Sequence, residues 1–339
     1  MKLRLIVPGR IDQATGGYRY AARMLAAWRA MGLDAGHREL DGQFPEVDAR
    51  ARAAAAACLA ARKADETLLI DGLALPAFEG LLPIRNAVAL VHHPLGLETG
   101  LSPERAGALL ASEARMLASF AGIVATSLAT LGDLRAMGLA GRRLAAVDPG
   151  TEPARPSYRR RGTPTILTVA TLTPRKDHRT LLRALARIRD RHWRAVFVGS
   201  ADRDQACAAC VRADIRGLRL GHRVRLAGER EPADLADTYR RASIFALASR
   251  HEGYGMAFAE ALAHGLPVAG ARAGAVPLVV PRRAGILVQP GNPAALARAL
   301  IRLLGPAHRR YAANAWRLQF PDWPRQAARL WSAVAGFAA

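Results

Sequence analysis

Two carboxylates stand eight residues apart, with a pair of glycines between them, in the stretch Glu252–Glu260. The stretch follows an apolar run, Ile244–Ala248, that predicts a β-strand. Gly253 and Gly255 let the backbone approach a ligand closely, and a helix is expected near Met256, where first-turn amides bind anions. Carboxylates accept hydrogen bonds in fixed directions, which suits vicinal sugar hydroxyls. The pattern indicates a site for a ligand with anionic and hydroxyl-bearing parts; the structural alternative is a glycine turn before a helix with two surface acids.

Two cations follow another predicted strand, Thr165–Val169, in the sequence Pro174-Arg175-Lys176. Lys176 is one of 3 lysines in a chain with 46 arginines. A compact ammonium therefore stands at this position although arginine is the usual cation of the chain. Cations at the start of a helix oppose its dipole unless an anion is bound. We therefore expect Arg175 and Lys176 to bind an anion, the alternative being a solvated helix start.

A third strand, Ala87–Val91, ends in the pair His92-His93. Two histidines could bind a metal, but no further ligand stands at motif spacing. An imidazole beside a reacting carbon can instead bond a hydroxyl or ease the development of charge. A structural loop histidine is the alternative, more so for His93 than for His92.

A glycine pair, Gly16-Gly17, stands between the first predicted strand and the first predicted helix. Paired glycines let a loop lie against a phosphate or a sugar. The pattern is not GxGxxG, so it does not indicate a nicotinamide site. Alone, it is equally an ordinary turn.

Two other patterns resemble metal or redox motifs. Asp202 and Asp204 imitate a metal-binding DxD, and Cys207 and Cys210 imitate a CxxC. The first follows a second-domain strand, and the second falls in a helical stretch without a second pair. We expect neither to be functional, and we predict that the protein needs no metal and no cofactor.

Short apolar runs alternate with longer amphipathic ones, which predicts parallel sheets covered by helices on both faces. Helices are expected at Gly17–Met31, from Ser102-Pro103-Glu104 onward, and at Arg325–Ala335 after breaks at Pro321 and Pro324. Further strands are expected at Leu3–Val7, Thr67–Ile70, Gly122–Ala125, Leu144–Val147, Ala195–Val198, Val224–Leu226, Pro267–Gly270 and Gly285–Val288.

Composition bounds the remaining possibilities. The 339 residues are 51% hydrophobic and 23% charged, which fits two domains and excludes a disordered or fibrous chain. We expect residues 1–150 and 165–320 to form the domains, with a Pro-rich linker at 151–164 and a C-terminal helix at 321–339 that packs back on the first. No apolar run is long enough to span a membrane, and MKLRLIVPGR suggests a strand rather than a signal peptide. Three cysteines, without a disulfide framework, suggest the cytoplasm.

The net charge of +21 lies almost wholly in the second half: residues 1–155 carry a net +2 and residues 156–339 a net +19. The second half is therefore expected to attract anions, including phosphates and, at the periphery, an anionic membrane surface. A nucleic-acid binder is expected to have aromatic residues interleaved with its basic residues, but aromatics are only 6% of this chain, so no specific nucleic acid is expected.

The stretch Ser249–Gly270 resembles the signature of the group 1, or family 4, retaining glycosyltransferases, which place Gly-aromatic-Gly between two acids. The resemblance implies the GT-B fold, in which two Rossmann-like α/β domains face across a cleft. It also implies that Glu252 contacts donor-sugar hydroxyls, that Glu260 contacts the ribose, and that the loop Gly253-Tyr254-Gly255-Met256 holds the donor through its amides.

The resemblance extends to the other motifs. It implies that Lys176 binds the donor diphosphate, and that Arg175 supplies the charge of a family arginine whose place is taken by Ala170 and Thr171. It further implies that His92 faces the transferred sugar.

Two glycine-rich turns also correspond to family features. The pair Gly16-Gly17 is implied to lie near donor and acceptor. The turn from Gly274 to Pro277 matches a family turn, but Leu278 stands where that family has an acid.

We accordingly expect a metal-independent hexosyltransferase that moves a hexose from a nucleotide-sugar to a saccharide or lipid-linked acceptor, in the synthesis of cell-envelope polysaccharide. Two alternatives stay open: a GT-B nucleotide-sugar epimerase, and a non-catalytic basic module that binds anionic polymer.

Overall fold

The computed structural model describes residues 1–13, 15–157 and 162–338, and it divides the chain into two units. Unit 1 comprises Met1–Gly150 and Pro321–Ala339, and unit 2 comprises Thr151–Phe320. The Arg159–Arg161 run of the predicted linker lies outside the described residues.

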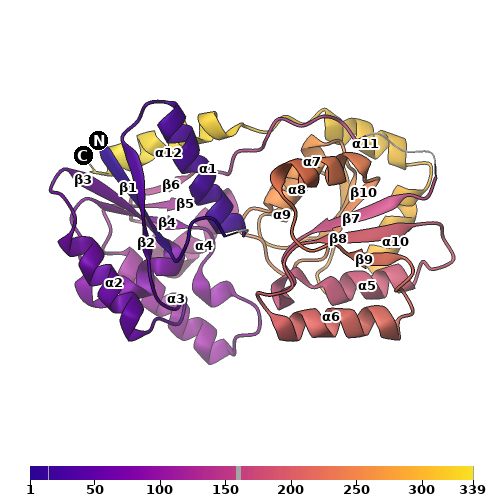
Figure 1. Ribbon diagram of the computed structural model, residues 1–339, viewed down its shortest axis with the longest axis horizontal. Helices are drawn as coiled ribbons and strands as arrows, with labels where there is room; N and C mark the ends of the chain where they lie inside the picture. The colour runs from indigo at the N-terminus through magenta and orange to yellow at the C-terminus, as the bar shows by residue number, and fades with distance from the viewer. Residues whose placement is uncertain (14, 158–161, 339) are drawn as a thin grey trace. The chain divides into compact units, whose positions relative to one another are not determined.

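Unit 1 contains a parallel sheet with the strand order β2-β1-β3-β4-β5-β6 (Figure 1). Its strands are β1 (Lys2–Pro8), β2 (Ala35–Leu40), β3 (Glu66–Asp71), β4 (Ala87–Val91), β5 (Gly122–Ala125) and β6 (Leu144–Ala146). Its helices and helical turns are α1 (Gly16–Ala30), α2 (Ala49–Ala60), η1 (Gly72–Leu81), η2 (Leu95–Leu97), α3 (Pro103–Leu117), α4 (Leu128–Leu134), η3 (Arg135–Leu139) and α12 (Trp323–Ala338).

The sheet of unit 1 is covered on both faces. One face packs on α2, η1, α3 and α4 through a core that includes Phe78, Leu117 and Leu134. Helices α1 and α12 pack against each other, and Trp28 of α1 donates its indole N–H to the carbonyl of Ala327 at 2.8 Å. The C-terminal segment thus belongs to unit 1, although unit 2 lies between the two parts of the sequence.

Unit 2 contains a second parallel sheet, with the order β12-β11-β10-β7-β8-β9 (Figure 1). Its strands are β7 (Thr165–Val169), β8 (Arg194–Val198), β9 (Val224–Leu226), β10 (Ile244–Leu247), β11 (Val268–Ala271) and β12 (Gly285–Val288). Its helices and helical turns are η4 (Pro174–Lys176), α5 (His178–Ala186), α6 (Gln205–Gly217), α7 (Pro232–Arg241), α8 (Met256–Ala263), α9 (Val276–Val279), α10 (Pro293–Leu304) and α11 (His308–Trp316).

The strand order of unit 2 reverses direction between β7 and β10, because the chain runs outward to β9 on one side and then outward to β12 on the other. In open parallel sheets, ligands bind outside the carboxyl ends of the strands at such a reversal. The loops that follow β7 and β10 are therefore the parts of unit 2 where a ligand site is expected.

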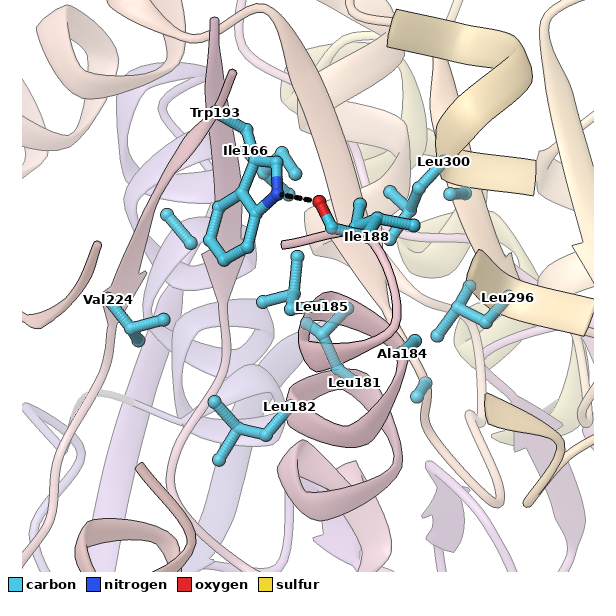
Figure 2. Packing of buried hydrophobic residues seen from close by; sticks show 14 of the residues in the cluster. Ile166, Leu181, Leu182, Ala184, Leu185, Ile188, Trp193, Val224, Leu296 and Leu300 are labelled. Atoms are coloured by element: carbon cyan, nitrogen blue, oxygen red, sulfur yellow. Dashed lines mark hydrogen bonds between the residues drawn. The ribbon is translucent and has the colours of Figure 1, made fainter. Parts of the chain in front are cut away.

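The core of unit 2 fixes these strands by packing helices on both faces. Figure 2 shows one of the faces, where Trp193 lies in one cluster with Leu181 and Leu185 of α5 and Leu300 of α10. The indole N–H of Trp193 donates to the carbonyl of Ile188 at 2.8 Å, so the buried polar atom is paired. The opposite face packs on α7, α8 and α9 through a second cluster that includes Phe258.

All eleven predicted strands are confirmed: five match to the residue, and the other six lie within one residue of the prediction at both ends. Strand β2 was not predicted from the sequence, since only Leu40 of its residues is buried and it shows no apolar alternation. The expected helix break at Pro324 is wrong: α12 begins at Trp323, and Pro324 lies in its first turn, where a missing amide proton costs nothing.

Candidate functional site

The loops after β7 and β10 are joined at the point where the sheet of unit 2 reverses. The amide of Arg250 donates to the carbonyl of Arg175 at 2.8 Å, and the guanidinium of Arg175 donates to the carbonyl of His251 at 3.3 Å. The two motifs that were singled out separately in the sequence therefore form one site in unit 2.

Lys176 and Glu252 are the centre of this site. The ammonium Nζ of Lys176 lies 2.7 Å from Oε1 and 2.9 Å from Oε2 of Glu252, and Ser249 donates its hydroxyl to Oε1 at 2.6 Å. Glu252 is 5% exposed. A carboxylate oxygen can accept two hydrogen bonds, so Oε1 has both from these two residues, whereas Oε2 has one from Lys176 and the capacity for another.

The charge of Glu252 depends on these cations. Burial raises the cost of ionising this carboxyl, but Lys176 and Arg175 beside it hold its pKa below the usual range. Glu252 is thus a buried carboxylate that is kept ionised by the same lysine that was expected to meet an anion.

The backbone around Glu252 is fixed from the β11–α9 turn. The carbonyl of Glu252 accepts a hydrogen bond from the amide of Ala275 at 2.9 Å. A Cβ on Gly274 would lie 2.2 Å from that same carbonyl oxygen, so the turn approaches this closely because residue 274 is glycine. The glycine-rich turn noted in the sequence therefore supports Glu252, and Leu278 beyond it is 62% exposed.

Helix α8 begins at Met256, as expected, with Gly255 as its N-cap in the left-handed region (φ 97°). No described side chain caps this end of the helix. First-turn amides without a capping acceptor are the groups that bind a phosphate oxygen. Gly253 and Tyr254 complete the turn between Glu252 and this helix start.

Glu260 lies one turn inside α8 and has a different partner from Glu252. Its Oε2 accepts the hydroxyl of Tyr239 at 2.9 Å. The ring of Tyr239 stacks on His264, with centroids 5.1 Å apart, and an imidazole nitrogen of His264 lies 2.9 Å from the carbonyl oxygen of Arg155. Tyr239, supported by His264, is thus one of the groups that hold Glu260.

Lys176 is placed by the residue after it. Asp177 adopts left-handed backbone angles (φ 45°, ψ 48°), and its carboxylate accepts the amide of Thr180 at 3.1 Å as the N-cap of α5. The guanidinium of Arg250 lies 3.1 Å from the same carboxylate. This cap fixes the start of α5 directly beside the lysine.

The sequence-predicted residues of unit 1 lie at the carboxyl ends of its strands. Nε2 of His92 lies 3.2 Å from Oδ2 of Asp71, the last residue of β3, but the two are not aligned as a hydrogen bond. The ring of Tyr20 meets the His92 ring edge-on at 5.3 Å, and Thr130 donates its hydroxyl to the His92 carbonyl at 3.0 Å. Asp71 and Tyr20 thus lie against the imidazole, and Thr130 fixes the backbone that carries it.

The glycine pair serves this histidine. A Cβ on Gly17 would lie 3.3 Å from Cδ2 and 3.4 Å from Nε2 of His92, whereas a Cβ on Gly16 would meet nothing within 4 Å. Gly17 thus leaves room for the imidazole, and the two glycines, which look equivalent in the sequence, differ in the structure.

His93 turns to other partners. Its Nε2 lies 3.4 Å from the carboxylate of Glu98. Burial raises the pKa of Asp133, and nearby His93 partly opposes that rise. His93 thus sits among acids, apart from the contacts of His92.

The two rejected motifs have structural roles. Asp204 caps α6 by accepting the amide of Cys207 at 2.7 Å, and Cys207 and Cys210 lie within that helix. Among the residues that the structure describes, no group of three or more His, Cys, Asp or Glu side chains is arranged to hold a metal ion. Over the same residues, no helix has the length and apolarity that crossing a membrane requires.

Sequence reasoning missed Asp71, Ser249 and Tyr239. Asp71 directly follows the predicted strand Thr67–Ile70, and the neighbouring strand β4 ends just before the histidines. An acid at this strand end could therefore have been predicted to lie near His92. Ser249 likewise follows a predicted strand. Tyr239 lies on α7, and nothing in the local sequence indicates its contact with Glu260.

Part of the sequence matches a known family and curated relatives. Residues 163–305 match the family model described as Glycosyl transferases group 1. A D-inositol 3-phosphate glycosyltransferase of Corynebacterium kroppenstedtii is 34% identical over 185 residues, which is 51% of this chain and 41% of the relative. A second, from Corynebacterium diphtheriae, is 36% identical over 134 residues, 38% of this chain and 31% of the relative. The match thus spans less than half the length of either relative.

Solved structures match the chain over its whole length. Sucrose-phosphate synthase from Thermosynechococcus elongatus superposes with a TM-score of 0.84 at 20% identity, over 99% of this chain and 98% of that one. Anabaena HepE in complex with UDP-glucose superposes with a TM-score of 0.79 at 17% identity, over 99% and 100%. At this identity the likeness shows the fold. The predicted two-domain α/β fold is confirmed: the chain has the GT-B fold, and its unit 2 carries the match to the group 1 glycosyltransferases.

Proposed function

We propose that this chain transfers a hexose from a nucleotide-sugar to a saccharide or lipid-linked acceptor with retention of configuration, and that unit 2 binds the donor. The observation that carries the proposal is the Lys176–Glu252 pair beside the uncapped start of α8, at the reversal point of the sheet. A cation and free helix amides suit a diphosphate, and a buried ionised carboxylate beside them suits sugar hydroxyls.

The proposed chemistry breaks the bond between the anomeric carbon and the donor diphosphate, and it forms a bond from that carbon to an acceptor hydroxyl, whose proton leaves with the diphosphate. Negative charge grows on the leaving phosphate, so the groups that matter most are those aimed at it. Lys176, Arg175 and the first amides of α8 supply them. Glu252 orients the sugar by accepting a hydrogen bond from a sugar hydroxyl at Oε2, which can accept one more. His92 is proposed to serve the transferred sugar, on the strength of the resemblance.

The ligands and names of similar proteins guide the choice of donor and acceptor. HepE is described with UDP and with UDP-glucose, and the curated relatives are inositol-phosphate glycosyltransferases. We therefore propose UDP-sugars as the first donors to test, with neutral and phosphorylated saccharides as acceptors. A role in cell-envelope polysaccharide, with peripheral contact to an anionic membrane through the basic second half, completes the proposal.

The donor site is tested with two matched substitutions, Glu252→Gln and Glu260→Gln. Glutamine keeps the shape but turns one oxygen acceptor into an N–H donor. A nucleoside diphosphate has no sugar for Glu252 to contact, so its dissociation constant should rise in Glu260→Gln, whose proposed partner is the ribose. Turnover should fall in Glu252→Gln, since displaced reacting groups cost up to ~100-fold.

The control for both variants is Glu229→Gln, which changes an exposed glutamate of the same unit. If Glu252→Gln weakens nucleoside-diphosphate binding as much as Glu260→Gln does, the two roles are misassigned. The anomeric configuration of the product, read by NMR, tests retention. A wild-type enzyme that converts the nucleotide-sugar without an acceptor would instead be an epimerase, and steeply salt-dependent polymer binding without nucleotide preference would indicate a binding module.

A further inference from the structure

A buried carboxyl group of unit 1 lies outside the site already described. Glu113, on α3, is 1% exposed. Its Oε2 accepts the amide of Leu95 at 2.8 Å, and its Oε1 is buried without a hydrogen-bond partner among the residues that the structure describes. A carboxyl with an unpaired oxygen is costly to bury, so its presence inside unit 1 needs a reason.

The residue that donates a hydrogen bond to Glu113 indicates why this carboxyl is buried. Leu95 begins η2, only two residues after His93, so the hydrogen bond fastens the loop that carries both histidines. The η2 turn packs closely on α3: a Cβ on Gly96 would lie 2.5 Å from the carbonyl oxygen of Ala106. The first end of this loop is fixed by β4, and the second end is fixed by Glu113.

The ionisation of Glu113 bears on this contact. Burial raises its pKa to about 7, and the hydrogen bond from Leu95 only partly opposes that rise. Other charged or titratable groups stand on or next to the elements that pack on α3: Glu79, His93, Glu98, Asp133 and Arg135. Burial is the principal cause, so the neutral carboxyl is the form that suits the packed loop.

We propose that Glu113 is a positioning residue, which in its neutral form holds the loop of His92 and His93 against α3. The inference rests on the proposed function, since it gives that loop a part in transfer. Ionisation places a charge with one unpaired oxygen inside the unit, which favours opening of the η2 contact toward water and displaces the histidines.

The test uses two variants and one control. Glu113→Gln keeps the acceptor for Leu95 but cannot ionise, and Glu113→Leu removes the acceptor and leaves the amide unpaired. Glu104→Gln changes an exposed glutamate at the start of the same helix and serves as the control. For each variant, kcat and the KM for the donor are measured from pH 6 to pH 8.5.

We expect the kcat of the wild type to fall as the pH rises through 7, relative to Glu113→Gln, so that the ratio of the two changes with pH. This ratio cancels any pH dependence that the two proteins share. Glu113→Leu should lose roughly tenfold or more in kcat with little change in the donor KM, because small displacements of reacting groups act on the chemical step. Glu104→Gln should match the wild type.

Two results would overturn the inference. One is a pH-independent ratio of wild type to Glu113→Gln, which would make the carboxyl merely structural. The other is a Glu113→Leu enzyme with a normal kcat. Should Glu113→Leu fail to fold, the comparison with Glu113→Gln still decides. Absence of any transfer by the wild type would count against the proposed function. If the wild type is active and the Glu113 variants behave like it, only the present inference fails.

Discussion

Replacing Lys176 with methionine removes the cation of a buried pair while keeping most of the apolar stem. Glu252 is 5% exposed and accepts hydrogen bonds from Lys176 at 2.7 and 2.9 Å, so the variant leaves a carboxylate inside unit 2 that has lost its hydrogen-bonded cation, although Arg175 stays nearby. Breaking a buried pair in this way costs about 3–5 kcal/mol. The lysine side chain is itself 18% exposed, which places the expectation at the lower end, ~3 kcal/mol. For a unit of this size the melting temperature should fall by roughly 6–12 °C.

The same reasoning predicts the stability of the double variant in which Glu252 is also replaced. In Lys176→Met/Glu252→Gln the stranded charge is gone, so the double variant should lose less stability than the two single variants together, by ~1 kcal/mol or more. The stability lost in the single variant Lys176→Met should also depend on pH. Without the lysine, burial raises the pKa of Glu252, so the deficit of Lys176→Met should shrink as the pH falls and the carboxyl is protonated.

The assay is denaturant unfolding followed by circular dichroism at pH 7 and at pH 4.5, with Lys63→Met as the control for the same exchange at an exposed lysine. Additive losses within about 0.5 kcal/mol, together with a deficit that does not change with pH, would refute the picture of a coupled pair. The lysine would then act on a bound anion alone, as the sequence by itself suggested.

Three further predictions concern the two units and the reaction. Gly17→Ala should lower turnover, since the added Cβ would press on the ring of His92 at 3.3–3.4 Å, whereas Gly16→Ala, with nothing within 4 Å, should not; equal effects in a transfer assay would contradict this. Burial lowers the pKa of His178 to about 4, helped by Lys176, so the unfolding free energy should fall by roughly 3 kcal/mol from pH 6.5 to 4. Urea titrations across that range should show a weaker dependence in His178→Leu. Transfer should persist in excess chelator, and a loss restored by manganese would overturn metal independence.

The donor-site loops could be found from the sequence because each motif follows a strand whose apolar run is unambiguous. Strands β7 and β10 are short and buried, so their ends are marked by the first polar or glycine residues. Parallel topology then brings the carboxyl ends of strands to one edge. These two facts suffice to place Lys176 and Glu252 at the same edge of one sheet.

What the sequence did not contain is the pairing across that edge. That Lys176 contacts Glu252, and that Tyr239 contacts Glu260, depends on which strands are neighbours and on where α7 packs. The edge strand β2 was missed for a related reason, because a strand with one buried residue has no pattern to read. Distances between loops are a property of the packed sheet, and local residue types do not encode them.

The interrupted course of unit 1 has a consequence for how the chain is made. The indole of Trp28 is capped by the carbonyl of Ala327, and Tyr20 packs edge-on against Trp323 at 6.1 Å, so α1 gains its cover from residues synthesised some three hundred positions later. Unit 2 is contiguous, and all of it is synthesised before α12 begins. Unit 1 therefore keeps an open apolar flank until α12 has been made, and this helix completes the unit whose synthesis began first.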